Sequence, residues 1–270
     1  MKKTLIKVGT VVTMDGSFRT LREGGIIING SMIEKVLDRQ ELSDLSFQGD
    51  ILDATNLVAI PGFIQTHIHL CQTLFRGLAD DLELLDWLRL KIFPFEAAHS
   101  ERSMYFSSLI GLAELIRSGT TTILDMGSVH HEEEVIRAVM DSGIRAFVGK
   151  AMMDINDMYP LLKESTKESV TSTVKQAEQW HNADNGRIRY AVAPRFILSC
   201  TDTLLSDAYQ ITTSFPGMLF HTHAAENRNE RACFPHLKVG ASNIVNPAKA
   251  GCNHGSSRSP RHALITAPRR

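Results

Sequence analysis

The sequence lacks the features that mark membrane, nucleic-acid-binding or secreted proteins. It has no run of about 18 apolar residues, which excludes a transmembrane helix. A formal net charge of -1 gives no electrostatic attraction to nucleic acid or to a membrane surface. Residues 1–7 contain no apolar segment of the signal-peptide kind. The cysteines show no CxxC spacing and are typical of free thiols in a reducing compartment (Cys71, Cys200, Cys233 and Cys252). We therefore expect a cytoplasmic protein with neither nucleic-acid nor membrane partners.

Acidic residues are missing from residues 231–270, although the chain contains 30 of them. On average composition, a segment of this length would carry about five. The same segment holds four of the nine prolines and shows neither a strand nor a helix period. One interpretation is a natural basic, disordered tail. The other, which we favour because the change is abrupt and interrupts a βα unit, is a slip of the reading frame near Glu230. Residues 231–270 are thus predicted to be an atypical, non-native or disordered tail.

The rest of the chain divides into two patterns. Residues 1–56 are typical of short antiparallel strands, with a hairpin signal at Asn29-Gly30, and are predicted to form part of a small β-sandwich. Residues 57–230 alternate between strands and amphipathic helices, which predicts parallel strands in a barrel or a doubly wound sheet. Strands are expected near residues 57–64, 120–126, 145–153, 188–194 and 217–223, and helices near 100–118, 131–142 and 163–181. The count of strands is five.

Two histidine motifs follow predicted strands. His67 and His69 are two residues apart, so a strand would point both side chains to the same face, where both could reach one ion. His221 and His223 repeat this spacing, and His223 lies nearer the carboxyl end of its strand, where parallel α/β barrels build active sites. Three imidazoles leave a coordination position open, which is the catalytic pattern for zinc and gives a bound water a pKa of about 7. The alternative is that they are hydrogen-bonded structural residues.

Three charged residues could complete such a site. Glu226 follows His223 by three residues and could shuttle a proton beside the metal, or could be an acid at a helix N-terminus. Glu96 is expected in a loop after Pro94, as a substrate contact or a plain surface acid. Arg195 follows the fourth predicted barrel strand, where a substrate contact would be placed.

Four segments carry a resemblance to a known family: residues 61–69 (PGFIQTHIH), 73–81 (TLFRGLADD), 119–122 (GTTT) and 221–226 (HTHAAE). They resemble the amidohydrolase superfamily, and within its cytosine-deaminase-like branch the deaminases of S-adenosylhomocysteine, 5′-methylthioadenosine and 5′-deoxyadenosine. The resemblance implies a (β/α)8 barrel of the TIM type, here incomplete, with a β-sandwich built from both chain ends. It also implies that His67, His69 and His223 bind Zn²⁺, or Fe²⁺, and that Glu226 moves the proton.

The same resemblance leaves the substrate open. It implies a purine-nucleoside-type substrate whose ribose Glu96 holds, and homo-oligomeric full-length relatives. However, adenosine-type deaminases carry a histidine where Arg195 follows Pro194, and residues 194–200 look more like guanine deaminases. Guanine deaminase or chlorohydrolase activity is therefore the alternative. A third is a catalytically inactive fragment, because the family's later Asp has no counterpart after Glu230 and His254 is a poor candidate for its later His.

Overall fold

The structure is a computed structural model that describes residues 3–224 and 263–266. The chain divides into two compact units, Met1–Gly62 and Phe63–Arg270. Pro61 and Gly62 lie between strand β4 (Asp50–Ala59) and strand β5 (Phe63–Ile68). Residues 57–59, which we expected at the start of the barrel, instead belong to β4 of the first unit, so the two units separate after the Pro-Gly pair.

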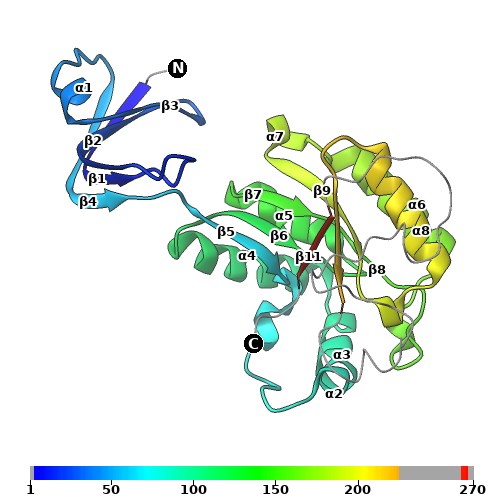
Figure 1. Cartoon of the computed structure of the whole chain (residues 1–270). Helices are drawn as coiled ribbons and strands as arrows, with labels where there is room; N and C mark the ends of the chain where they lie inside the picture. The colour runs from blue at the N-terminus through cyan, green and yellow to red at the C-terminus, as the bar shows by residue number, and fades with distance from the viewer. Residues whose placement is uncertain (1–2, 225–262, 267–270) are drawn as a thin grey trace. The chain divides into compact units, whose positions relative to one another are not determined.

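The first unit is a four-stranded sheet with the order β3-β2-β1-β4 (Figure 1). Its elements are β1 Lys3–Val12, β2 Thr20–Asn29, β3 Met32–Leu37, α1 Arg39–Ser43 and β4 Asp50–Ala59. The predicted hairpin at Asn29-Gly30 is confirmed, since Asn29 pairs with Met32 and Gly30 takes a positive φ of 60°. The expectation of antiparallel pairing throughout is wrong for β4, which runs parallel to β1. The segment containing α1 provides the crossover that a parallel pair needs.

The second unit is built on a parallel sheet with the order β11-β10-β9-β7-β6-β5, and β8 pairs with β9. Its strands are β5 Phe63–Ile68, β6 Thr120–Asp125, β7 Arg145–Val148, β8 Ala151–Met152, β9 Ile188–Pro194, β10 Leu219–His223 and β11 Ala263–Thr266. The predicted fold class, an incomplete TIM-type barrel, is confirmed. The strand expected over 145–153 is interrupted at Gly149, where a Cβ atom would lie 2.1 Å from the carbonyl oxygen of Ala191.

The pairing of β11 with β10 was not expected. Ala263–Thr266 lie parallel to Phe220–His223, with His223 opposite Thr266. These four residues come from the segment that we predicted to be atypical or disordered, and they are apolar and β-branched enough to form a strand. The remainder of that segment, apart from these four, lies outside the described residues.

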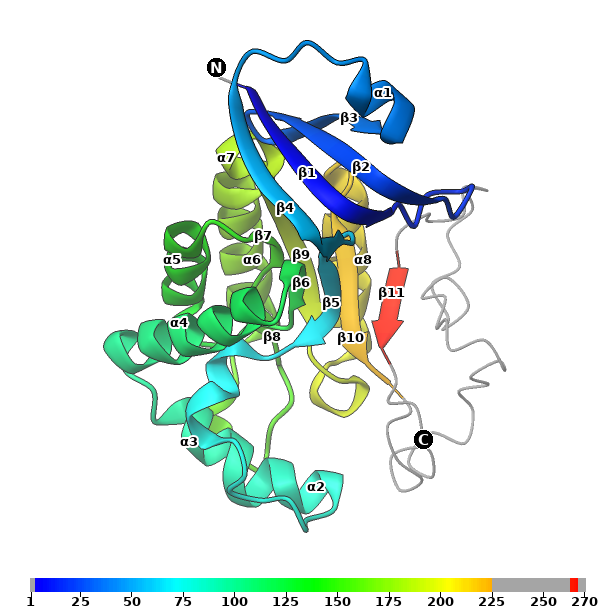
Figure 2. The same ribbon diagram turned by 90° about the vertical axis from the view of Figure 1, so that its left-hand side faces the viewer.

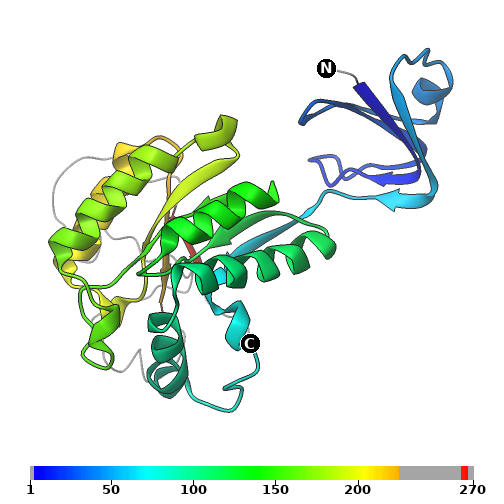
Figure 3. The same cartoon turned by 180° about the vertical axis from the view of Figure 1, so that it is seen from behind.

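Helices cover one face of the curved sheet (Figures 2 and 3). The three predicted helices are confirmed as α4 Glu101–Arg117, α5 Glu132–Ser142 and α6 Thr166–Trp180. Ser100 caps α4 by accepting a hydrogen bond from the backbone N–H of Ser103, and Gly143 ends α5 with φ of 75°. The other helical segments are η1 Leu70–Phe75, α2 Leu84–Trp87, η2 Leu88–Ile92, α3 Phe93–Ala97, η3 Pro160–Leu162, α7 Ala183–Gly186, η4 Ile197–Ser199 and α8 Asp202–Ser214.

The apolar core of this unit lies between the sheet and the helices. Ile123, Ala146 and Ile188 on three neighbouring strands pack against Leu112 of α4 and Val135 of α5, and all five side chains are buried. This packing fixes the carboxyl ends of the strands in space and therefore the side chains that follow them. Among the described residues, every helix is too short or too polar to cross a membrane.

Candidate metal centre

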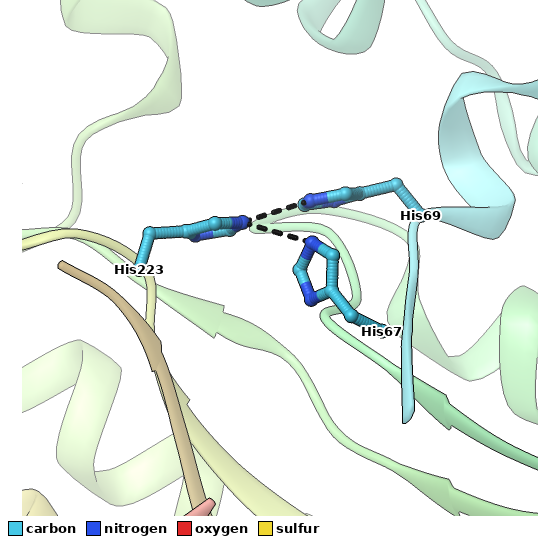
Figure 4. A group of neighbouring side chains, drawn as sticks. All are labelled: His67, His69 and His223. Carbon is cyan, nitrogen blue, oxygen red and sulfur yellow. Dashed lines mark hydrogen bonds between the residues drawn. The ribbon is translucent and has the colours of Figure 1, made fainter. Parts of the chain in front are cut away.

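Three imidazoles converge at the carboxyl ends of β5 and β10 (Figure 4). The Nε2 atom of His223 lies 3.2 Å from Nε2 of His69 and 3.2 Å from Nε2 of His67. Strands β6, β7 and β9 separate β5 from β10 in the sheet, so the two motifs meet across the curvature of the barrel. One candidate ligand atom from each histidine lies within 4.8 Å of the others. The structure thus brings together the three residues that the sequence nominated.

The orientation of His223 is fixed by Arg195. The ring Nδ1–H of His223 donates to the backbone carbonyl oxygen of Arg195 at 2.6 Å, and its backbone N–H donates to the same oxygen at 3.1 Å. With the proton on Nδ1, the Nε2 atom presents a lone pair to the other two rings. Metal-binding histidines commonly donate their second ring N–H in this way, because it sets both the tautomer and the ring orientation.

A fourth histidine, His221, also contacts this group. Its Nε2 lies 2.9 Å from Nδ1 of His67, and its side chain is fully buried. Sequence reasoning set His221 aside in favour of His223. The sequence could have indicated a role for His221, because residues two apart on a strand share a face and His221 and His223 repeat the spacing of His67 and His69.

Burial keeps these imidazoles neutral. Loss of solvation lowers the pKa of His67, and it lowers the pKa of His69 further, with the positive charge that His223 would carry adding to the effect. The pKa values of His221 and His223 fall to about 3, first through burial and then through His67. A neutral imidazole is the form that binds a metal, so the donor set fits a divalent ion such as zinc.

Asp125, the last residue of β6, holds the chain that follows His69. Its two carboxylate oxygens accept hydrogen bonds from the backbone N–H groups of Leu70, at 2.8 Å, and Gly127, at 2.9 Å. Burial, and then the charge of Glu96, raise the pKa of Asp125 to about 7. Sequence reasoning missed this residue, although its place at the carboxyl end of a barrel strand could have drawn attention to it.

Glu96 and Arg195 form a buried ion pair. The expectation that Glu96 lies in a loop is wrong, since it belongs to α3 and is 1% exposed. Pro94 follows the helical turn η2, and Ile92 and Phe93 both keep right-handed helical backbone angles, so the helix continues through the proline. Both oxygens of Glu96 accept from the Arg195 guanidinium, at 2.5 and 2.8 Å, and Oε1 also accepts from Gln72 at 2.8 Å.

A cavity of about 140 Å³ lies against the histidines. Arg195 and Gln72 contribute polar groups to its lining, and Trp87 and Phe93 contribute aromatic rings. Trp87 also packs with Leu84 and Leu88. Among the described residues, Glu96 does not line this cavity, whereas Arg195 and Gln72, which both donate to its carboxylate, do. Glu226 lies outside the described residues.

Comparison with known proteins places these features in a family. Residues 58–236 match the Amidohydrolase family. The 5′-deoxyadenosine deaminase of Methanosphaera stadtmanae is 34% identical over 210 residues, covering 78% of this chain and 47% of that protein. The 5-methylthioadenosine/S-adenosylhomocysteine deaminase of Caldicellulosiruptor saccharolyticus is 33% identical, covering 83% of this chain and 49% of that protein. The chain therefore spans about half the length of the curated relatives that it matches.

Solved structures show the same fold. Guanine deaminase of E. coli superposes with a TM-score of 0.74 at 26% identity, covering 87% of this chain and 57% of that one. An adenosine deaminase from Xanthomonas campestris with bound zinc gives a TM-score of 0.77 at 24% identity, with coverage of 87% and 52%. These likenesses show the fold, and the bound zinc belongs to the Xanthomonas campestris protein.

Proposed function

The chain belongs to the amidohydrolase family, and on that premise we propose that its second unit carries part of the active site of a metal-dependent adenosine-type deaminase. The substrate class is 5′-deoxyadenosine, 5′-methylthioadenosine or S-adenosylhomocysteine, as in the names of the relatives. The observation that carries the proposal is the convergence of the Nε2 atoms of His67, His69 and His223. These residues would hold zinc or ferrous iron.

The reaction replaces the amino group of the purine by oxygen. A bound divalent ion would supply Lewis-acid activation of water at neutral pH. Oxygen from water bonds to the ring carbon, the carbon–nitrogen bond breaks, and ammonia leaves with the protons it needs. We propose that Glu226 carries a proton to the ring nitrogen and then to the departing amine, because it follows His223 by three residues in the sequence.

The cavity beside the histidines supports a flat, polar-edged substrate. Trp87 and Phe93 offer ring surfaces, and Gln72 and Arg195 offer hydrogen-bond donors at its wall. Of the two substrate-binding candidates, Arg195 lines this cavity, whereas the oxygens of Glu96 already accept from Arg195 and Gln72. We therefore propose that Arg195 meets the substrate directly and that Glu96 acts by holding the guanidinium in place.

The test is ammonia release by the purified, zinc-loaded chain. Each of the three adenosine-type substrates would be compared with guanine, and wild type with Glu226→Gln and His223→Asn. Release from an adenosine-type substrate that is lost in both variants supports the proposal. Catalysis by this chain would be overturned if the chain binds one zinc but releases no ammonia. It would also be overturned if wild type and Glu226→Gln release ammonia at the same rate. Preference for guanine would transfer the assignment to guanine deamination.

A further inference from the structure

The contact between His67 and His221 has a chemical consequence. Nδ1 of His67 and Nε2 of His221 are 2.9 Å apart, and the two rings meet edge to face, with centroids 5.1 Å apart and planes inclined at 83°. Two imidazole nitrogens at this distance form a hydrogen bond only if one carries a proton and the other presents a lone pair. Each partner therefore dictates the tautomer of the other.

The position of His67 decides which partner donates. Its Nε2 faces Nε2 of His223 and must keep a lone pair if it is to bind a metal ion. The single proton of neutral His67 must then sit on Nδ1 and be donated to Nε2 of His221. As a result His221 holds its own proton on Nδ1. His221 thus accepts the Nδ1 proton of His67, as the carbonyl oxygen of Arg195 accepts the Nδ1 proton of His223.

We propose that His221 is a positioning residue that orients His67 and fixes its metal-binding tautomer. The inference rests on the metal site of the proposed function. His221 lies on β10 two residues before His223. The strand therefore directs His223 toward the metal position and His221 toward His67, the ligand on β5. Its full burial removes competing water from the hydrogen bond. His221 itself is not a ligand here, because its Nε2 faces the far side of the His67 ring.

The variants follow from what each side chain can accept. His221→Phe keeps the ring but has no acceptor. His221→Gln places an amide oxygen near the position of Nε2, whereas the amide of His221→Asn is one bond shorter. His181→Phe is the matched control, because the His181 ring is also hydrogen-bonded, to the backbone of Pro216 and Tyr190, away from the metal ligands.

Zinc affinity is measured by competition with a chelator, and Co²⁺ absorption reports the ligand geometry. We expect His221→Phe and His221→Asn to bind zinc about 10- to 100-fold more weakly with an altered Co²⁺ spectrum. His221→Gln and His181→Phe should remain near wild type. Wild-type affinity in folded His221→Phe would overturn the inference. If that variant does not fold, equal affinities of the Gln and Asn variants would do so. A wild-type chain that binds no zinc would overturn the metal site as well.

Discussion

Glu96 and Arg195 are 99 residues apart in the chain and form a two-point ion pair in which both side chains are almost fully buried. The pair joins α3 to the end of β9. The backbone oxygen of Arg195 in turn orients His223. A helix that contributes no predicted metal ligand is thus linked, through a single arginine, to the three-histidine group.

Removing the charge of Glu96 should therefore destabilise the chain. Glu96→Gln leaves the Arg195 guanidinium buried without a counter-charge, and breaking such pairs typically costs about 3–5 kcal/mol of unfolding free energy. Urea denaturation monitored by circular dichroism measures the loss. The double variant Glu96→Met with Arg195→Met is the control, since it removes both charges and should recover much of the stability. A loss below about 1 kcal/mol in Glu96→Gln would contradict the buried pair.

Asp125→Asn should weaken zinc binding. The amide offers one acceptor where the carboxylate offers two, so the backbone N–H of Leu70 or Gly127 loses its partner and the chain after His69 shifts. We expect about tenfold weaker zinc affinity, by analogy with other residues that position metal ligands. The assay belongs at pH 8, where Asp125 is mostly ionised. Asp141→Asn is the control, because Asp141 bonds the hydroxyl of Tyr105 at an exposed site. Unchanged affinity in Asp125→Asn would refute its positioning role.

Two glycines with nearly equal φ should respond differently to alanine. Gly127 has φ of 72° and a Cβ there would lie 2.1 Å from the carbonyl oxygen of Gly149, whereas Gly143 has φ of 75° and open space. Gly143→Ala should cost only the backbone strain, about 1–2 kcal/mol. Gly127→Ala adds a clash with a backbone atom and should cost at least about 3 kcal/mol, or prevent folding. Thermal melts of the two variants measure this difference. Equal melting temperatures would argue against the close approach of Gly127 to the backbone of Gly149.

The stabilising effect of His223 should depend on pH. Its pKa falls to about 3 in the folded chain, from 6.5 when solvated, so the unfolded chain takes up the proton first as pH falls. Stability should thus be lost progressively below pH 6.5, and the advantage of wild type over His223→Asn should shrink by about 2 kcal/mol between pH 7 and pH 5. Urea denaturation in the presence of a chelator tests this, because the difference cancels the titrating groups that do not interact with His223. An advantage that is constant over this range would contradict the burial of His223.

Local patterns were enough to predict much of the second unit. The alternation of strands and helices indicated parallel pairing and located α4, α5 and α6, because periodicity depends on neighbours in sequence. The pairing of β4 with β1 and the helical setting of Glu96 were beyond such reasoning. The first depends on pairing between strands that are distant in sequence, and the second on a helix that continues through Pro94, where a proline normally ends it.

The sequence by itself determined that His67 and His69 share one face, since the geometry of a strand requires it, and that His223 lies at the end of another strand. Only the tertiary structure decided that these residues meet, because β5 and β10 are separated by three strands and approach each other through the curvature of the sheet. It also decided the partners that orient them. The carbonyl of Arg195 reaches His223, and the ring of His221 reaches His67, through contacts that no spacing in the sequence records.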